Sequence, residues 1–522
     1  MKYFLLIACC LLFTVAPAQT VDNRTTTKND LLHTVEAVRT RYDRAFDSLF
    51  RNAAKIGEAQ FWLSYRQLMF AYRRQFATAV SFTEAGTEGL SKLSRSAAKQ
   101  LSADSWHVAV ETMTQKFADK KIRSKNAADY RYLIAMNAAG ADFAAAVRNE
   151  QALFRSGFAG YGDSLDQVDH FTAAMQWNAA LDLNERLAQT HANDTLLLAE
   201  ISRQRSDIYS AQMDSAQALS QLIEAEYLLQ QVVPDAQSRR LHVKVLLDMA
   251  VLQNKANDFQ GALANAKKAQ GITESSDSFN RALGFMVTGI IYQKAGAPKE
   301  AEETLRAAYE LFLAYTNVHR EEAGPVFAEL IDAYAVAVKW FDRDKLYEEL
   351  LQEAAAVRAQ LSVYGLPYYR FEYARTLYTL GQKYMNVDVK IGPAEKAWTE
   401  AGALLEPLIK ENVVLVGDLA CDNYYKLAGC KSAFKKTAEA KAIFRKSLQV
   451  REALYAIAPA TYARDLATVQ IQNANFDAQD KDFEGAIRRL DVAEQKAKET
   501  GDKHMIGEIN NFRDYLKEKI NK

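Results

Sequence analysis

Small side chains recur at a regular interval along most of this chain, and the architecture can be predicted from them. One column, spaced by 39 to 47 residues, consists of Ser206, Ala250, Gly289, Ala335, Gly381, Ala428 and Ala474. A second column, twelve residues later in all but one case, consists of Ala218, Ala262, Ala301, Tyr347, Ala397, Ala440 and Ala486. Helices approach closely only where one side is small, so the recurrence predicts one antiparallel helix pair, stacked repeatedly.

Turn-forming residues mark the ends of the predicted helices. The turn inside most pairs is expected at Asn257-Asp258, Gly296 with Pro298, Asp342 with Asp344, Gly392-Pro393, and Asp480 with Asp482. Breaks between pairs are expected near Ser275-Ser276, Gly324-Pro325, Gly365 with Pro367, Gly417, and Pro459. Together these signals predict about seven units over residues 199–515 with a period near 46, followed by a short tail at 516–522.

The chain before residue 199 is also predicted to be helical. Apolar residues with a spacing of three and four indicate long helices around residues 42–53 and 61–79, within an N-terminal helical region at 19–126. Residues 127–198 suggest degenerate helix pairs, with a turn at Asp142-Phe143 and a helix running from Phe171 to Leu187. These segments either extend or cap the repeats, or form a separate domain.

The first residues have the pattern of an export signal. Lys2 precedes an apolar run, and Ala16-Pro17-Ala18 is a small-x-small cleavage site, so residues 1–18 are predicted to be removed after Ala18. The run is shorter than the roughly 20 residues that span a membrane. A lipobox ending at Cys9 is the alternative, and it would make the protein an outer-membrane lipoprotein. The protein is therefore expected in the periplasm or outside the cell.

Composition supports long helices and a protein partner. The 522 residues are 49% hydrophobic and 25% charged, and they include only 8 prolines and 22 glycines, so an all-α fold is expected. Lys plus Arg equals Asp plus Glu at 65 each, which gives no overall field that would attract nucleic acid. No segment after the signal is long and apolar enough to be predicted as a membrane span.

The repeating units resemble the tetratricopeptide repeat family. Its pattern of large residues, glycine, aromatic residues and alanines is matched by Phe285, Gly289, Tyr292, Ala301, Leu305 and Ala308, and again by Leu377, Leu380-Gly381, Tyr384, Ala397 and Ala401. Arg451, Leu454, Pro459, Tyr462 and Asp465-Leu466-Ala467 resemble the segment between kinesin-light-chain-like repeats, whose period is also long. The resemblance, in what the signal segment suggests is a bacterial exported protein, implies a right-handed superhelical solenoid. Tyr347 departs from the family's pattern in the alanine column.

The sequence lacks the motifs of common catalytic and metal sites. There is no His-Glu-x-x-His, no Gly-x-Ser-x-Gly and no phosphate-binding loop. The seven histidines are scattered singly, and Cys421 and Cys430 are predicted to lie on opposite faces of one helix, too far apart for a disulfide. We therefore expect a protein that is not an enzyme and needs no cofactor or metal.

The resemblance implies a binding groove on the concave side, which in this family is lined by the first helix of each pair. The residues carried over to that face are Arg203, Asp207 and Asp422 together with the candidate site Lys244, Asn254, Gln293, Asp332, Trp340, Arg375, Tyr378, Gln382 and Tyr425. Aromatic side chains beside Arg and Asn suit an extended peptide. The alternative is that Trp340, Tyr378 and Tyr425 belong to the core between repeats.

Three functional hypotheses follow. The first is a non-catalytic scaffold of the bacterial envelope that binds a peptide or protein segment in the groove. The second is a glycan or nutrient receptor on similar helices, although such receptors usually have long loops rich in Trp, Asn and Gly, and this chain has 5 tryptophans. The third is an enzyme whose site is assembled from dispersed residues.

Overall fold

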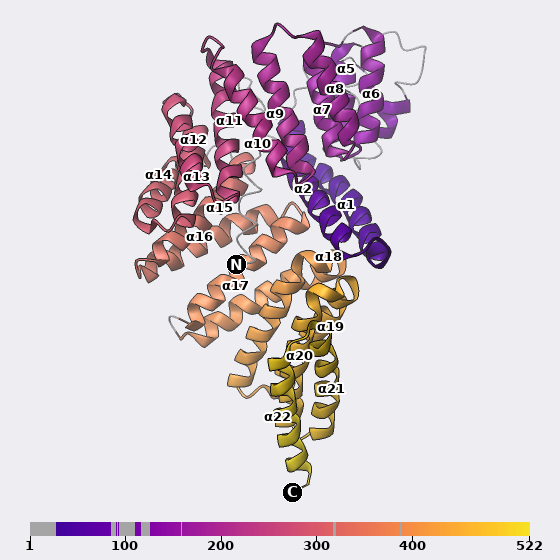
Figure 1. The fold of residues 1–522 in the computed structure, drawn as a ribbon, viewed down its shortest axis with the longest axis vertical. Helices are drawn as coiled ribbons and strands as arrows, with labels where there is room; N and C mark the ends of the chain where they lie inside the picture. Colours follow the sequence, from indigo (N-terminus) through magenta and orange to yellow (C-terminus); the bar gives the residue numbers. More distant parts are fainter. Residues whose placement is uncertain are drawn as a thin grey trace. The chain divides into compact units, whose positions relative to one another are not determined.

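The computed structural model describes residues 28–84, 90, 92, 95, 110–115, 126–157, 159–316, 320–386 and 389–521, and every regular element in these ranges is a helix (Figure 1). The predicted export signal at 1–18 lies outside the described residues. By their contacts the residues divide into two units, one comprising residues up to Tyr42 and Arg66–Leu366 and the other Asp43–Tyr65 and Pro367–Lys522. The predicted all-α class and the repeated antiparallel pairing are confirmed.

Unit 1 contains six helix pairs in chain order. They are α5 (Ala127–Ala139) with α6 (Phe143–Ser156), α7 (Tyr161–Ala173) with α8 (Trp177–Thr190), α9 (Thr195–Ala211) with α10 (Ser215–Leu229), α11 (Ala236–Lys255) with α12 (Phe259–Ile272), α13 (Ser278–Lys294) with α14 (Pro298–Thr316), and α15 (Arg320–Lys339) with α16 (Asp344–Ser362). Each pair packs against the next, so the core of unit 1 runs as a row of alanine and leucine layers between successive helices.

Unit 2 continues the same arrangement. Its helices are α17 (Pro367–Asn386), α18 (Ile391–Ala433), α19 (Thr437–Ile457), α20 (Pro459–Gln479), α21 (Phe483–Thr500) and α22 (Lys503–Ile520). Non-helical backbone at Asn412 divides α18, so that its first part pairs with α17 and its second part with α19. The helix α22 covers α21 at the end of the row and buries Leu516, so the tail expected at 516–522 is part of the last helix up to Ile520.

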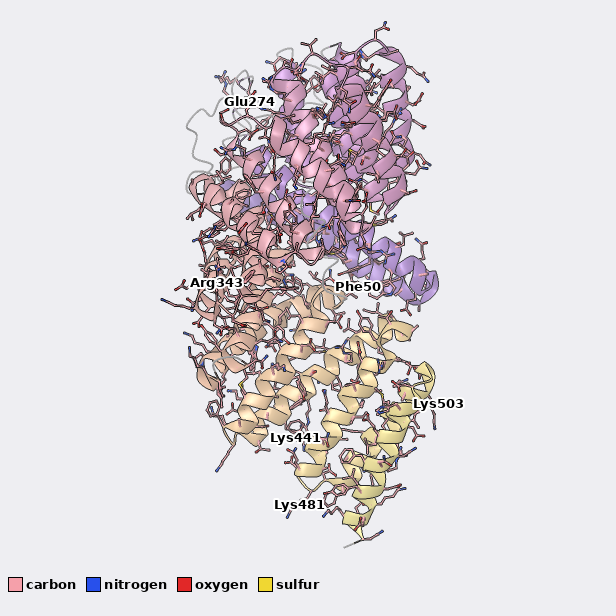
Figure 2. All side chains as sticks on the ribbon, turned by 60° about the vertical axis from the view of Figure 1, so that its left-hand side comes forward. Phe50, Glu274, Arg343, Lys441, Lys481 and Lys503 are labelled. Carbon is pink, nitrogen blue, oxygen red and sulfur yellow. The ribbon has the colours of Figure 1, made fainter. Side chains whose placement is uncertain are left out.

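The turn inside most pairs has one recurring geometry. The second residue after the first helix adopts positive φ, and the next backbone N–H donates to a carbonyl five residues back at 2.8 to 2.9 Å, as the Schellman motif requires. The positive-φ residues in this geometry are Ala141, Met175, Met213, Asn257, Gly296, Lys435 and Lys481, the last of which is labelled in Figure 2. Because the turns of α5–α6 and α7–α8 share this geometry, residues 127–190 consist of the same kind of pair as the later repeats.

In four of these turns an aspartate also caps the N-terminus of the second helix. The backbone N–H of Asp142, Asp214, Asp258 or Asp482 closes the Schellman turn, while its carboxylate accepts the N–H three residues later at 2.9 to 3.2 Å. One residue thus ends the first helix and caps the second, which satisfies backbone groups that would otherwise lack partners.

The small columns lie where the helices of a pair cross. Ala262, Ala266 and Ala269 of α12 are fully buried against Ala250 of α11. A Cβ added to Gly289 in α13 would stand 2.8 Å from Cδ2 of Leu305 in α14, closer than real Cβ contacts. In unit 2, an added Cβ on Gly381 would stand 2.7 Å from Cδ1 of the buried Trp398. Small residues are therefore required where the backbones come closest.

Several predicted boundaries were wrong. The helix expected from Phe171 to Leu187 is two helices, because Met175 turns the chain with a φ of 60°. Gly417 lies inside α18, where it allows close contact with Leu454, and the break falls instead at Asn412, whose side chain accepts the N–H of Leu415 at 3.0 Å. Pro325 lies within α15 rather than between helices.

The predicted long N-terminal helices form a hairpin of α1 (Lys28–Ile56) and α2 (Glu58–Glu84). The tyrosine rings of Tyr42 and Tyr72, 5.0 Å apart, join the two helices within unit 1, and Phe46 and Tyr65, 5.7 Å apart, join them within unit 2. Contacts thus divide this hairpin between the two units, and the separate N-terminal domain considered as an alternative is not one of the units.

Candidate binding surface

The most densely charged buried region of unit 1 lies on first helices. Arg203 on α9 is only 2% exposed, and its guanidinium donates to Asp207 at 2.7 Å and to Glu200 at 3.0 and 2.7 Å. Spacings of three and four residues place all three side chains on one face of α9. A buried arginine is tolerated here because two carboxylates on the same helix neutralise it.

Neighbouring first helices add further charges to this face. Asp169 of α7 accepts a hydrogen bond from Gln204 at 3.1 Å and interacts electrostatically with Arg203. Lys244 and Asp248 of α11 interact electrostatically with Arg203 and Asp207. We call these six residues the charge cluster: Asp169, Glu200, Arg203, Asp207, Lys244 and Asp248.

Part of the charge cluster is covered by helix α2 of the same unit. Arg74 lies 3.4 Å from the Asp207 carboxylate, Gln67 donates to the carbonyl of Gln212 at 3.5 Å, and Phe70 is buried against Ala211. Figure 1 shows α2 beside α9. The face that resemblance assigned to an open groove at Arg203 and Asp207 is therefore already in contact with another helix of the chain.

Two members of the charge cluster, Lys244 and Asp248, interact with it only electrostatically within the described residues. Asp248 is 4% exposed, and its carboxyl forms no hydrogen bond or ion pair with any residue in the described ranges. Lys244, one helical turn earlier, likewise makes none among the described residues. A buried carboxyl without a hydrogen bond is costly, so this end of the cluster gains less from the described contacts than the Arg203 end does.

The surroundings shift the pKa values of the cluster in different directions. Burial opposes ionisation of Asp207, but the charges of Arg203, Arg74 and Lys244 outweigh it and lower the pKa to about 2. Burial raises the pKa of Asp248 to about 7, because the charge of Lys244 offsets only part of the desolvation. Burial also lowers the pKa of Lys244. Such divergent shifts within one cluster are typical of binding and catalytic surfaces.

The stability of unit 1 should depend on Asp248 between pH 4 and pH 7. An unfolded aspartate releases its proton near pH 4 while folded Asp248 holds it to about 7, so the folded form binds more protons and loses stability as pH rises through this window. In urea unfolding, Asp248→Asn should match the wild type at pH 4 and be more stable above pH 7. A difference that stays constant from pH 4 to pH 8 would contradict this assignment.

A second buried polar pair joins α6 to α7. Nδ1 of His170 lies 2.5 Å from Oε1 of the buried Glu150, and this hydrogen bond helps to raise the pKa of His170 against the opposing effect of burial. Nothing in the sequence pattern indicated this pair, because the two residues are twenty positions apart on different helices. The contact fixes the packing of two neighbouring helix pairs.

The predicted site residues in unit 1 have different environments. Lys244 is a member of the charge cluster, whereas Asn254 is buried and its carbonyl accepts Nζ of Lys294 at 2.5 Å. Gln293 donates to the carbonyl of Ala333 at 2.7 Å, and Asp332 accepts two hydrogen bonds from Arg358 at 2.8 and 2.6 Å. Thus Asn254, Gln293 and Asp332 join neighbouring helices.

Trp340 differs from these residues because it is 58% exposed directly after α15. Val336 and Phe341 beside it in sequence are exposed as well, and the Arg343 guanidinium lies 5.6 Å from the Phe341 ring. These exposed apolar side chains are accessible to a partner. The idea that Trp340 belongs to the core between repeats is wrong.

The predicted residues in unit 2 contact other residues of the same unit. Arg375 pairs with Glu372 one turn earlier, and Gln382 donates to the hydroxyl of Tyr378 at 2.8 Å. Tyr425 is exposed on one side, while its ring packs edge-on against Phe444 of α19 at 5.5 Å. Arg375, Tyr378 and Gln382 therefore lie along one face of α17, and Tyr425 of α18 packs against α19.

The tip of the N-terminal hairpin occupies another surface, within unit 2. Glu58 accepts the backbone N–H of Ala460 at 3.1 Å and the hydroxyl of Thr461, so it caps the first turn of α20. Trp62 donates to the Thr461 hydroxyl at 3.2 Å, and the hydroxyl of Tyr65 lies 3.5 Å from Oδ1 of Asn412. The N-cap of α20, Ala458, has no side-chain oxygen, so Glu58 provides what the local sequence lacks.

Other site classes have little support in the described ranges. Within them, no group of three or more His, Cys, Asp and Glu side chains is arranged to hold a metal ion. Cys421 and Cys430 are both buried and free, and burial raises the pKa of Cys421 to about 11. Among the described helices, none combines the length and apolar character needed to cross a membrane.

Comparison with known proteins finds likeness only among solved structures. No family model and no curated protein matches the chain. Similar structures include BtubC (BKLC) from P. vanneervenii, 17% identical over 46% of this chain and 92% of that one, with a TM-score of 0.38. The quorum sensor NprR from B. thuringiensis is 12% identical over 64% of this chain and 98% of that one, with a TM-score of 0.37. The TPR2AB domain of yeast Sti1, in complex with pHSP90, is 17% identical over 61% of this chain and 98% of that one, with a TM-score of 0.21. These neighbours are tetratricopeptide-like helical repeat proteins, and at such scores the fold of this chain rests on its own helix pairs.

Proposed function

We propose that this protein is a non-catalytic scaffold that binds a protein segment on the faces of its first helices. The observation that carries the proposal is the contact of α2 with α9, in which one helix of the chain uses the charge cluster as a binding surface through Arg74 and Phe70. A surface that accepts a helix from a distant part of the chain has the shape and charge to accept one from a partner. Lys244 and Asp248, which form no hydrogen bond or salt bridge with a described residue, leave part of that surface for further contacts.

The proposed location is the bacterial periplasm or the exterior. It rests on the predicted signal at residues 1–18, with cleavage after Ala18 and lipidation at Cys9 as the less favoured route. A segment of an envelope protein is accordingly the proposed partner. N-terminal sequencing of the mature protein tests the location, because a first residue of Gln19 supports cleavage and a modified Cys9 supports an anchor.

The exposed aromatic residue Trp340 offers a direct test of the scaffold function. Envelope proteins that bind the intact chain should be lost from Trp340→Ala, because a large exposed aromatic at the end of a first helix contributes a few kcal/mol when a partner buries it. Affinity capture followed by quantitative mass spectrometry measures this loss. The control is Tyr227→Ala on the second helix α10, where the ring is equally accessible at 63% exposure.

Three outcomes are distinguishable in that experiment. Loss of the same partner from Trp340→Ala alone supports binding on the first helices. Loss from both variants, or from Tyr227→Ala alone, would place binding on the other side of the pairs. Recovery of identical partners by both variants and the wild type would remove α15 from the binding surface.

A further inference from the structure

The charge cluster contains more acidic groups than its own basic groups and Arg74 of α2 can neutralise. The cluster has four carboxylates, Asp169, Glu200, Asp207 and Asp248, against two cations, Arg203 and Lys244. Burial raises the pKa of Asp169, and it raises the pKa of Asp248 to about 7, so the full net charge of −2 is reached only once both have ionised. Arg74 of α2 neutralises one of these charges through Asp207. One negative charge remains, and Asp248 is the buried carboxylate that forms no hydrogen bond or salt bridge with a described residue.

We infer that α2 is an exchangeable occupant of this surface, and that the partner replacing it is a basic amphipathic helix. The inference deepens the proposed function and rests on it. The partner helix would present an aromatic side chain toward Ala211 and a cation one turn later toward Asp207, as Phe70 and Arg74 do. A second cation further along the partner would reach Asp248.

The polar contacts that α2 makes with the charge cluster are long. At the cluster, Arg74 approaches Asp207 at 3.4 Å, and Gln67 reaches the Gln212 carbonyl at 3.5 Å, both at the long limit of a hydrogen bond. The pairs within the cluster are much shorter, with Arg203 at 2.7 Å from Asp207. The cluster is therefore held together by its own helices, and α2 adds contacts from outside.

Covalent linkage favours α2 over any free helix. A tethered segment acts at an effective concentration in the millimolar range, so a free helix of the same sequence competes poorly while α2 is bound. Weakening the α2 contact should therefore expose the surface to a free helix. A partner that also pairs with Asp248 gains a charge-assisted contact that α2 lacks, which compensates for the missing tether.

The test uses the full mature chain and a fluorescein-labelled synthetic peptide of residues 66–84. The wild type should bind this peptide weakly, and Arg74→Ala should bind it at least tenfold more tightly by fluorescence anisotropy, because its own α2 has lost the ion pair. The same peptide with Arg74→Ala should bind the Arg74→Ala chain about tenfold more weakly than the native peptide does. An Asp207→Asn chain should bind the native peptide no better than the wild type does.

Equal binding of the native peptide by the wild type and by Arg74→Ala, or equal affinity of native and Arg74→Ala peptides, would overturn the exchange. Should Arg74→Ala lose helicity in circular dichroism, Gln67→Ala replaces it, since that change removes only one long hydrogen bond. If Trp340→Ala still loses its envelope partner while the peptide shows no exchange, the proposed function stands and this inference fails.

Discussion

Replacing Arg203 with alanine is expected to destabilise unit 1 by about 3–5 kcal/mol, the cost of breaking a buried ion pair from one side. The change leaves the buried carboxylate of Asp207 with only the long contact to Arg74, and it removes the cation that neutralises Glu200. The measurement is urea unfolding followed by circular dichroism, with hydrogen exchange of the α9 amides to assign the transition to unit 1.

Arg205 provides a matched control on the same helix. It donates to Glu185 at 2.7 Å, the same distance as between Arg203 and Asp207, but that partner carboxylate is exposed. A pair with an exposed partner contributes about 0–1 kcal/mol, so Arg205→Ala should have little effect. Equal losses from the two variants would mean that burial of the charge cluster has no special energetic role.

Replacing Trp398 with alanine is expected to destabilise unit 2 by about 3–5 kcal/mol, as for other large buried aromatics. Trp398 is 1% exposed, fills the space between α17 and α18, and donates its indole N–H to the carbonyl of Tyr378 at 3.1 Å. Urea unfolding of the variant measures the loss. Tyr515→Ala on α22, where the ring is half exposed, should cost less than about 1 kcal/mol.

The contact between Trp398 and Gly381 makes a sharper version of this experiment. Gly381→Ala alone should destabilise by about 1–3 kcal/mol, because the new Cβ meets the indole ring. In the Trp398→Ala background the same change should stabilise by up to about 1 kcal/mol, since space is now free and alanine favours a helix. Additive effects in the double variant would contradict the packing role of Gly381.

The repeated helix pairs could be predicted because the residues that form each pair are close together in the sequence. The small side chains at Ala250, Ala262 and Ala269 directly report the close crossing of α11 and α12, and turn residues such as Asn257 mark the positive φ between them. Prediction failed where a turn used residues without a conformational signature. Met175 adopts the same left-handed geometry as Asn257, but methionine has no preference for it, so the turn between α7 and α8 was not evident.

The candidate site was predicted less completely because its contacts are remote in sequence. Helical register was enough to place Lys244, Arg203 and Asp207 on first helices, since side-chain direction follows from position. The sequence did not indicate that Arg74, 133 residues before Asp207, lies over them. The apolar face of α2 shows that the helix is buried somewhere, and nothing in its pattern specifies against which helix.

The cap that Glu58 places on α20 has a consequence for how the protein acquires its structure. Glu58 and Ala460 are 402 positions apart, so at 5–20 residues per second the ribosome needs about 20–80 s to supply the second after the first. Repeat proteins otherwise fold by contacts between neighbours in sequence, and long-range closure is slow. Glu58 and Trp62 therefore complete their native contacts with α20 only after most of the chain has been made.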